Sequence, residues 1–576
     1  MSNTTSGGAF AFLRKDHIIA KPGYNRWLVP PASIAMHLCI GSVYAWSVFN
    51  PPLTKQLGVV ASSADDWSLS SVVWIFSVAI LVLGLAAAFA GKWLEDVGPR
   101  MVGVVAAVCW GGGFLVGSIG ISTHQLWLLY LGYGVFGGIG LGLAYVSPVS
   151  TLIRWFPDRR GMATGMAIMG FGGGAMIAAP LKGWLLSLYA KAPEFLGSTD
   201  TVKLVTENGR QFAETAAGKI EVVVATAKQA AALPGGGDAG AYIVGTGNTG
   251  AAATFVTLGI GYFIVMMIAA FMYRVPAAGW KPAGWTPKPV AGGMITQNNV
   301  DINQSLKTPQ FWQMWIMLCF NVTAGIGVIG VAKTMMSEIF GTTMPLIVTA
   351  AFASTYVLMI SVFNMCGRFF WASTSDYIGR KNTFHAFFIL GTALYLSIPY
   401  FASAGSANPS MIYLVGFYVA TMVIFTMYGG GFATIPAYLA DVFGTMHVGG
   451  IHGRILTAWS TAGVAGPLVI TSLREFSLNA ALHNLAAKID PAAFAAKFGA
   501  PLDQLDALIK AKTVTVAKLM EVAPAGTVDP TPSLYNTTMY VMAGLLVIAF
   551  VVNLFMRPVA AHHHHDEPEL SAVPVE

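Results

Sequence analysis

Charged residues are scarce in this sequence, and their scarcity limits what the chain can be. Asp, Glu, Lys and Arg make up 10% of the 576 residues, whereas hydrophobic residues make up 55% and the mean hydropathy is +0.64. A soluble protein of this length needs many more charged side chains to cover its surface. The net charge of +6 is modest, and it fits basic loops beside a membrane better than a surface that binds nucleic acid.

Cysteine is also rare, and Cys39, Cys109, Cys319 and Cys366 each lie within an apolar segment. Isolated cysteines in such segments pack as small core residues, and their spacing matches neither a disulfide framework nor a metal site. A phosphate-binding loop between a strand and a helix is missing too. We therefore expect no metal, no cofactor and no catalytic residue, and we predict that the protein is not an enzyme.

Long apolar segments dominate what is present. Roughly twelve of them are long enough to cross the ~30 Å hydrocarbon core of a bilayer as helices. They cover residues 27–50, 69–90, 101–121, 125–152, 161–189, 254–274, 311–337, 346–372, 384–404, 410–440, 452–473 and 535–556. The sequence predicts an all-α polytopic membrane protein whose twelve transmembrane helices form two pseudo-symmetric halves, residues 27–274 and 311–556.

Basic residues near the ends of these segments predict the orientation. They gather on one side of the predicted membrane: Arg14, Lys15, Lys21, Arg26, Arg100, Arg154, Arg159, Arg160, Arg274, Lys281, Lys288, Arg380, Lys381, Arg454 and Arg557. Basic loops mark the cytoplasmic side. The tails (1–26 and 557–576) and the linker (275–310) are therefore expected in the cytoplasm. Residues 1–26 are polar and lead into a full-length apolar segment, so no cleavable signal peptide is expected.

Two polar inserts, residues 190–253 and 474–534, fall at equivalent places in the two halves and are expected on the outer face. The stretch "AAKIDPAAFAAKFGAPLDQLDALIKAKTVTVAKL" in the second insert has a helical period and predicts short helices. Neither insert shows a chemical motif.

Two short loops repeat between the halves, "GKWLEDVGPR" (91–100) and "ASTSDYIGRK" (372–381). Each places an acid, a glycine and a basic residue between two apolar segments. An aspartate at a helix end can bind basic residues of a neighbouring helix and so hold one conformation. The sequence therefore predicts a conformational latch made of Asp96, Arg100, Asp376 and Arg380, with solvated turns as the alternative. Duplicated halves are typical of secondary transporters that bind their substrate midway between them.

These loops resemble the signature of the major facilitator superfamily, although Pro99 is inserted in the first and Ala372 replaces the leading glycine in the second. Within it, four stretches resemble the oxalate/formate antiporter family, which is related to the monocarboxylate carriers. The stretches are "GSVYAWSVFNPPL" (41–53), "YGVFGGIGLGLAYVSPVSTLIRWFPDRRGMATG" (133–165), "GRFFWASTSDYIGRK" (367–381) and "YGGGFATIPAYLADVFG" (428–444). The resemblance covers the membrane segments but neither insert. It implies a multi-pass protein of a bacterial inner membrane, and we expect a monomer.

Arg368 is the sharpest candidate for the substrate site. It lies inside an apolar segment, and guanidinium cannot lose its proton to avoid that environment. The resemblance implies that an arginine of the eighth helix binds the substrate carboxylate, which suits the bidentate geometry of arginine. The alternatives are a structural pair with a carboxylate on another helix and a side chain that reaches the cytoplasmic surface.

Aromatic residues with polar groups occur in the helices that the resemblance places around the cavity. They are His37, Tyr44, Trp46, Tyr145, Tyr428 and Trp459. His37 and Tyr44 are seven positions apart and should share a helix face. Any one of these residues could serve only in packing, so the set as a whole carries the prediction.

The number of buried cations bears on the substrate. The resemblance implies a second basic residue in helix 11 of an oxalate carrier, but Trp459 stands at about that place. One cation suits one negative charge, because a leftover buried charge is costly. Lys333 and Lys182 each either reach the outer surface or face the cavity, and a cavity-facing lysine would allow dicarboxylates.

The sequence thus predicts a secondary active carrier of small organic anions such as formate, lactate, pyruvate or acetate. The work would come from a counter-anion or from a proton, for which His37 is the candidate. The alternatives are an oxalate or dicarboxylate antiporter, a multidrug-type exporter on the same fold, and a membrane sensor that uses the outer inserts.

Overall fold

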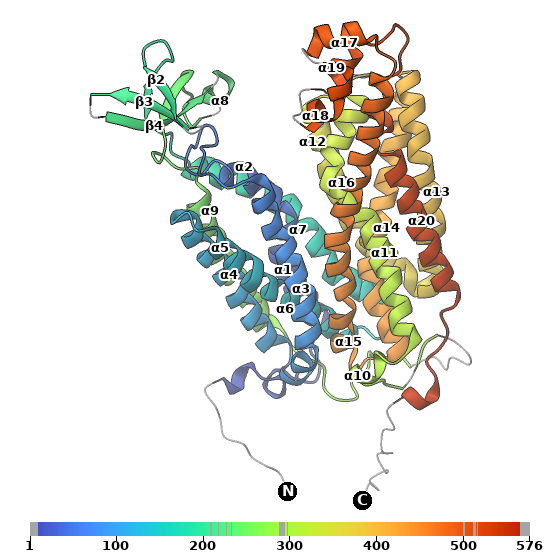
Figure 1. Cartoon of the computed structure of the whole chain (residues 1–576). Helices are drawn as coiled ribbons and strands as arrows, with labels where there is room; N and C mark the ends of the chain where they lie inside the picture. Colours follow the sequence, from blue (N-terminus) through green and yellow to red (C-terminus); the bar gives the residue numbers. More distant parts are fainter. Residues whose placement is uncertain are drawn as a thin grey trace, which may run out of the picture. The chain divides into compact units, whose positions relative to one another are not determined.

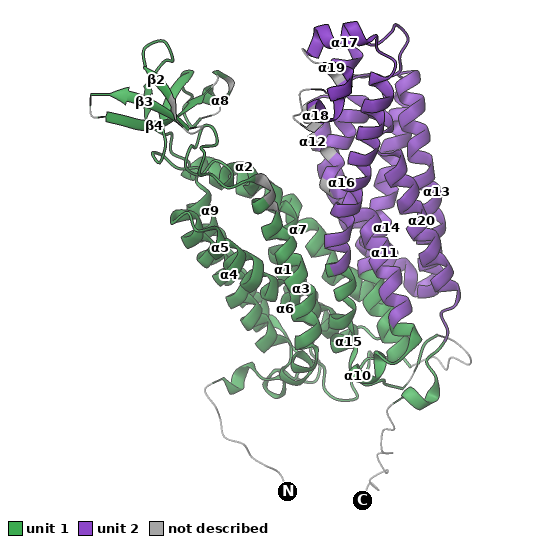
Figure 2. Cartoon of the chain, viewed as in Figure 1, with its two compact units in different colours: residues 1–311, 433–460, 558–576 green, residues 312–432, 461–557 purple. Residues whose placement is uncertain are grey.

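The computed structural model describes residues 10–564 except 208–209, 217, 226, 232, 287–293, 297, 499–500, 511–513 and 515. Two compact units divide the chain (Figure 2). Unit 1 holds residues 1–311, 433–460 and 558–576, and unit 2 holds residues 312–432 and 461–557.

Twelve helices among the described residues are long and apolar enough to cross a membrane, as predicted. Those that begin in unit 1 are α1 (Pro30–Gly41) with η4 (Ser42–Phe49) and α2 (Asn50–Leu53), α3 (Leu69–Val97), α4 (Pro99–Ser122), α5 (Leu126–Leu129) with η5 (Tyr130–Phe136) and α6 (Gly137–Trp155), α7 (Arg160–Tyr189), α9 (Ala251–Met272), and α15 (Val448–Ile455) with α16 (Thr457–Ala486). In addition, α11 (Pro309–Phe340) begins at the end of unit 1 and continues through unit 2, and the others, α12 (Ala350–Ile378), α13 (Arg380–Ala407), α14 (Met411–Phe443) and α20 (Asn536–Leu554), begin in unit 2. The predicted fold class is confirmed (Figure 1).

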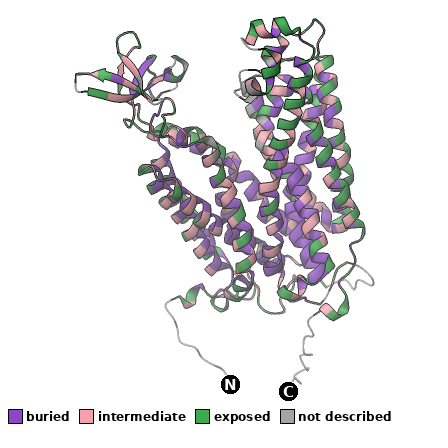
Figure 3. Cartoon of the chain, viewed as in Figure 1, coloured by how far each residue is buried: buried purple, intermediate pink, exposed green. Residues whose placement is uncertain are grey.

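Exposed residues occur along the lengths of the helices (Figure 3). Many of the exposed residues are large and apolar, among them Phe89 at 86% exposed and Trp127 and Trp184 at 60%. An apolar surface of this kind is unfavourable in water but not in the hydrocarbon of a bilayer. The distribution fits helices whose outer faces meet lipid.

The first membrane-spanning segment is bent in its middle. Regular α-helix ends at Gly41, and Ala45 within η4 has φ −94° and ψ 24°, outside the helical range. A break in a buried helix leaves carbonyl oxygens that need other donors. The bend therefore creates acceptors inside unit 1.

Glycine lets this bent segment touch α7. A Cβ atom added at Gly41 would lie 2.2 Å from the carbonyl oxygen of Phe171, and one added at Gly174 would lie 2.6 Å from that of Leu38. The two backbones are therefore in direct contact, which only glycine permits.

The first insert forms a five-stranded antiparallel sheet, where the sequence suggested no strands. Its strands are β1 (Phe195–Gly197), β2 (Leu204–Glu207), β3 (Arg210–Thr215), β4 (Gly218–Ala225) and β5 (Gly240–Ile243), in the order β1-β5-β4-β3-β2, with α8 (Ala227–Ala231) between β4 and β5. Val223 and Tyr242 pack against Val59 and Val60, which anchors the sheet to the α2–α3 connection.

The first part of the predicted second insert is helical, because α16 continues past residue 473 to Ala486. Leu482 and Leu485 on this extension pack around Phe494, so tertiary contacts lengthen the helix beyond its apolar run. The short helices expected after it are present as α17 (Pro491–Phe498), α18 (Leu505–Lys510) and α19 (Val516–Met520).

Candidate functional site

Arg368 lies on α12 of unit 2, and its side chain is fully buried. Its Nε donates a hydrogen bond to Asn364 Oδ1 at 3.1 Å, and its Cζ lies 5.2 Å from the centre of the Phe432 ring on α14. Asn364 is one helical turn before Arg368, so both occupy one face. A Cβ atom at Gly429 would stand 3.1 Å from Arg368 Cγ, so the glycine makes room for the side chain.

Tyr428 belongs to the same region of unit 2. Its ring centre lies 5.3 Å from that of Phe432, and the residue is 2% exposed. Phe432 therefore touches both Arg368 and Tyr428. This arrangement offers a charged donor beside an aromatic wall, which suits a small anion with an apolar end.

A second aromatic cluster occupies unit 1. It brings His37, Tyr44, Tyr145 and Trp459 together around Phe171. The ring centres lie 5.3 Å apart for His37–Tyr145, 5.0 Å for Tyr44–Phe171, 5.4 Å for Tyr145–Phe171, 5.2 Å for Tyr145–Trp459 and 6.2 Å for Tyr44–Trp459. Four of the predicted site residues thus share one cluster, which we call the Phe171 cluster.

Trp46 lies elsewhere in unit 1. Its indole N–H donates to the carbonyl oxygen of Val72 at 3.2 Å, and its ring centre lies 4.4 Å from that of Tyr133, with the two rings tilted by 43°. Residues two positions apart on a helix point in different directions, so the side chains of Trp46 and Tyr44 contact different residues. Trp46 packs α3 and η5 against the bent segment.

His452 on α15 also belongs to the Phe171 cluster, although it is not among the site residues predicted from the sequence. It is 1% exposed, its ring centre lies 5.9 Å from that of Tyr145, and neither ring nitrogen has a hydrogen-bond partner among the described residues. Its position seven residues before Trp459 is the signal that could have revealed it, because residues at that spacing share a helix face.

Lys182 points into unit 1 rather than to its surface. The side chain is fully buried, and Nζ donates to the carbonyl oxygens of Ser42 at 2.8 Å and Ala45 at 3.2 Å. The ammonium also lies 4.7 Å from the centre of the Phe49 ring. Lys182 therefore supplies donors to the bend in the first segment. The backbone of Lys333 lies in α11, but its side chain falls outside the described residues.

In the first loop, the acidic residue that binds neighbouring helices is Glu95, whereas the sequence predicted Asp96. Glu95 is 9% exposed, and it accepts a hydrogen bond from Gly449 N–H at 2.8 Å, at the N-terminus of α15, and another from Arg154 Nη2. Asp96 is exposed and forms no salt bridge among the described residues. Counting would have shown this, because Glu95 is the fourth residue after Gly91 just as Asp376 is the fourth after Ala372.

Arg100 binds backbone rather than a carboxylate, since its guanidinium donates to the carbonyl oxygens of Phe12 at 3.0 Å and Phe271 at 3.2 Å. In the second loop, Arg380 Nη2 lies 2.6 Å from Asp376 Oδ1, so those two residues do pair. The repeated loops therefore use their basic residues differently.

Lys15 lies beside the first loop, and its Nζ donates to the Glu95 carbonyl oxygen at 3.4 Å. Burial and then the nearby Arg154 guanidinium lower the pKa of Lys15, while the Glu95 carboxylate opposes them. A further pair, Arg160 with Asp441 at 2.9 Å, ties the start of α7 to the end of α14.

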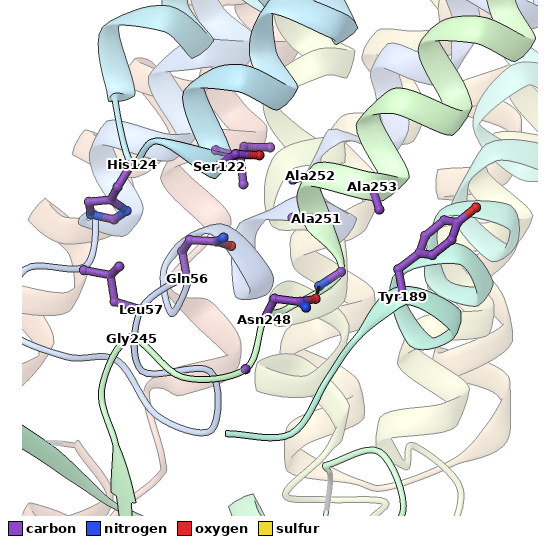
Figure 4. Close-up of a pocket in the computed structure, with 13 residues that line it drawn as sticks. Gln56, Leu57, Ser122, His124, Tyr189, Gly245, Asn248, Ala251, Ala252 and Ala253 are labelled. Carbon is purple, nitrogen blue, oxygen red and sulfur yellow. Dashed lines mark hydrogen bonds between the residues drawn. The ribbon is translucent and has the colours of Figure 1, made fainter. Parts of the chain in front are cut away.

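A cavity of about 430 Å³ lies where the sheet joins the helices of unit 1 (Figure 4). Gln56, Ser122, His124, Tyr189 and Asn248 line it together with the first residues of α9. None of the residues selected from the sequence lines this cavity. Among the described residues, no group of three His, Cys, Asp or Glu side chains is placed to hold a metal ion.

The known proteins that this chain is similar to are membrane carriers. The Major Facilitator Superfamily model matches residues 32–196. The chain is 24% identical over 443 residues to the oxalate:formate antiporter of Oxalobacter formigenes, covering 77% of this chain and 83% of that protein. It is 21% identical over 474 residues to apicoplast pyruvate carrier 1 of Toxoplasma gondii, covering 73% and 79%.

Among solved structures, the fold is similar to that of the major facilitator superfamily proton:xylose symporter XylE. The TM-score is 0.52 at 12% identity, over 91% of this chain and 94% of the other. This similarity concerns the fold alone. With twelve helices apolar enough to cross a membrane, the chain is a multi-pass membrane protein that is similar in sequence and fold to carriers of the major facilitator superfamily.

Proposed function

We propose that this transporter carries small monocarboxylates and that Arg368 binds the carboxylate group. The observation that carries the proposal is the buried guanidinium on α12, oriented by Asn364 and seated over Phe432. A carboxylate can accept two parallel hydrogen bonds from such a fork. The names of the relatives, an oxalate:formate antiporter and a pyruvate carrier, agree with a carboxylate substrate.

The charge of the site favours one carboxylate over two. Trp459 is fully buried within the Phe171 cluster, so an aromatic ring fills the place where the resemblance implies a lysine. Lys182 donates to backbone oxygens of its own unit. A dianion at a single cation would retain one uncompensated charge in an apolar medium, which is costly.

The same charge balance suits alternating access. A substrate carboxylate bound at Arg368 would add a negative charge beside the guanidinium while the loaded carrier changes conformation. We propose that residues 27–274 and 311–556 act as the two moving halves, with both termini in the cytoplasm of a bacterial cell. Glu95, Arg154, Asp376 and Arg380 would stabilise one of the conformations.

Uptake into proteoliposomes tests this proposal. The purified chain would be assayed with labelled formate, acetate, lactate, pyruvate and oxalate, with and without an internal counter-anion. We expect saturable monocarboxylate uptake that Arg368→Gln abolishes and that Arg368→Lys retains only weakly, because lysine keeps the charge but loses the fork.

The matched control is Arg210→Gln, which makes the same change in the sheet of the first insert, where Arg210 pairs with Asp65. Normal uptake by Arg368→Gln would refute the site. Strong competition by oxalate would point to the dicarboxylate antiporter instead. Loss of activity in Phe and Trp variants with tolerance at Arg368 would indicate an exporter of hydrophobic compounds.

A further inference from the structure

Lys182 is a fully buried basic residue on α7 of unit 1. Its two recorded acceptors, Ser42 O and Ala45 O, stand on either side of Tyr44 in the bent segment η4. The ammonium therefore holds the short stretch of backbone that carries Tyr44. The Tyr44 ring in turn packs on Phe171 and Trp459 of the Phe171 cluster.

Among the described residues, no Asp or Glu forms a salt bridge with Lys182; Asp441 at the end of α14 pairs with Arg160 at the other end of α7. The elements packed most extensively against α7 are α1, η4, α6 and α9, and none of them has an Asp or Glu in its sequence, nor does α7 itself. The titratable or charged side chains on these five elements are His37, Cys39, Tyr44, Tyr145, Arg154, Arg160, Tyr189 and Tyr262. Lys182 forms no salt bridge with any described residue, so only backbone dipoles and the Phe49 ring offset its charge.

The equivalent residue of the other half is different. Arg474 follows Gly453 by 21 positions, as Lys182 follows Gly161. Arg474 Nη2 pairs with Glu338 on α11, Arg474 Nε donates to the Tyr535 hydroxyl at 3.1 Å, and that hydroxyl donates to Glu338 at 2.5 Å. Unit 2 thus compensates its cation with a carboxylate, whereas unit 1 leaves its cation with carbonyl groups.

The two side chains also differ in chemistry. Arginine stays charged in proteins, while a buried lysine can release its proton near neutral pH. Neutral lysine keeps at most two N–H donors and makes weaker hydrogen bonds than the ammonium. Loss of the proton would therefore loosen the bend at Ser42 and Ala45, and with it the position of Tyr44.

We propose that Lys182 carries a proton that is coupled to transport, and that it acts as a positioning residue for Tyr44. This inference rests on the proposed carriage of monocarboxylates. With the proton bound, the ammonium holds the bend and keeps Tyr44 in the Phe171 cluster. When the proton leaves to water, the bend relaxes and Tyr44 is released. One proton moving with one carboxylate makes the transported pair electrically neutral. Lys182 lies seven residues before the end of α7 at Tyr189, about 10 Å along the helix, so the proton has a short path to that end.

Two transport assays in proteoliposomes separate this role from substrate binding. The first measures exchange of labelled acetate against internal acetate at one pH, and the second measures accumulation of acetate driven by a pH gradient. In Lys182→Arg the side chain stays positively charged at every pH used, and in Lys182→Met the side chain has no charge. We expect both variants to lose accumulation by about tenfold or more while keeping measurable exchange, because neither can cycle a proton.

The control is Arg474→Lys, which changes the cation that Glu338 compensates in unit 2. This variant should keep both acetate exchange and acetate accumulation. Accumulation by Lys182→Arg at the wild-type level would overturn the inference. If the wild type exchanges no carboxylate at all, the proposed function is refuted. The proposed role of Lys182 is then tested by a measurement that needs no substrate.

That measurement is a pH titration of the protein in lipid nanodiscs with 5-fluorotryptophan, followed by fluorine NMR. Trp459 is assigned from its loss in Trp459→Phe. Because Trp459 packs on Tyr44, we expect its signal to shift with pH in the wild type and to stay constant in both Lys182 variants. A shift that persists in Lys182→Met would assign the titration to another group and refute the proposal. A signal that is constant in the wild type would refute it as well.

Discussion

The carboxylate of Glu95 provides a sharp test of the latch, because its neighbour Asp96 is the residue that the sequence suggested. The change is Glu95→Gln, which keeps the shape of the side chain and removes its charge. In the structure, one carboxylate oxygen accepts from Gly449 N–H at 2.8 Å and the other from Arg154. Both contacts weaken when an amide replaces the carboxylate.

The size of the effect follows from these two contacts. A charge-assisted hydrogen bond is roughly twice as strong as a neutral one, so the Gly449 contact loses about 1 kcal/mol. The Arg154 side chain is 22% exposed, so losing that ion pair costs about 1–2 kcal/mol, less than a fully buried pair would. Together these losses amount to about 2–3 kcal/mol, or about 30- to 150-fold in an opening equilibrium.

Hydrogen–deuterium exchange of the peptide around Gly449 measures this directly. We expect amide exchange in residues 446–456 to become about 30- to 150-fold faster in Glu95→Gln. Asp96→Asn is the matched control, and because that side chain is exposed its exchange should stay within about twofold of the wild type. Equal acceleration in both variants, or acceleration only in Asp96→Asn, would show that the contact geometry does not carry the latch.

Other parts of the structure make further predictions. Gly41→Ala would place a methyl group 2.2 Å from the Phe171 carbonyl oxygen, so we expect a large loss of folded protein in size-exclusion profiles, whereas Gly112→Ala, which has open space, should express normally. Glu338→Gln leaves Arg474 and Tyr535 without their carboxylate and should lower the free energy of unfolding by about 2–3 kcal/mol. Adding Arg474→Met should recover part of that loss. If the effects of the two substitutions simply add, Arg474, Glu338 and Tyr535 are not energetically coupled. Val223→Asp buries a charge where the sheet packs on Val59 and Val60 and should expose residues 190–250 to protease without stopping uptake, so a loss of uptake would give the sheet a part in transport.

Much of the fold could be predicted because the bilayer constrains it. Backbone groups in hydrocarbon must bond within their own helix, so long apolar runs become helices wherever they occur. The sheet of the first insert was not foreseen, since short strands in a polar segment depend on pairing partners distant in the sequence, such as the packing of β4 and β5 with Val59. The length of α16 was underestimated for the same reason, because its last turns are held by Phe494 rather than by lipid.

The class of this protein, its twelve helices and its family resemblance follow from the amino-acid sequence alone, and so does the choice of Arg368, because a permanent charge in an apolar segment is conspicuous in any context. How the polar groups are used depends instead on tertiary packing. Glu95 and Asp96 are neighbours with the same charge, and which one meets the N-terminus of α15 depends on how α3 and α15 pack. Likewise, Lys182 could have reached the surface, but the bend at Ser42 and Ala45 presents carbonyl oxygens that draw its ammonium inward. Such choices depend on distances between residues far apart in the chain, which spacing within one helix does not determine.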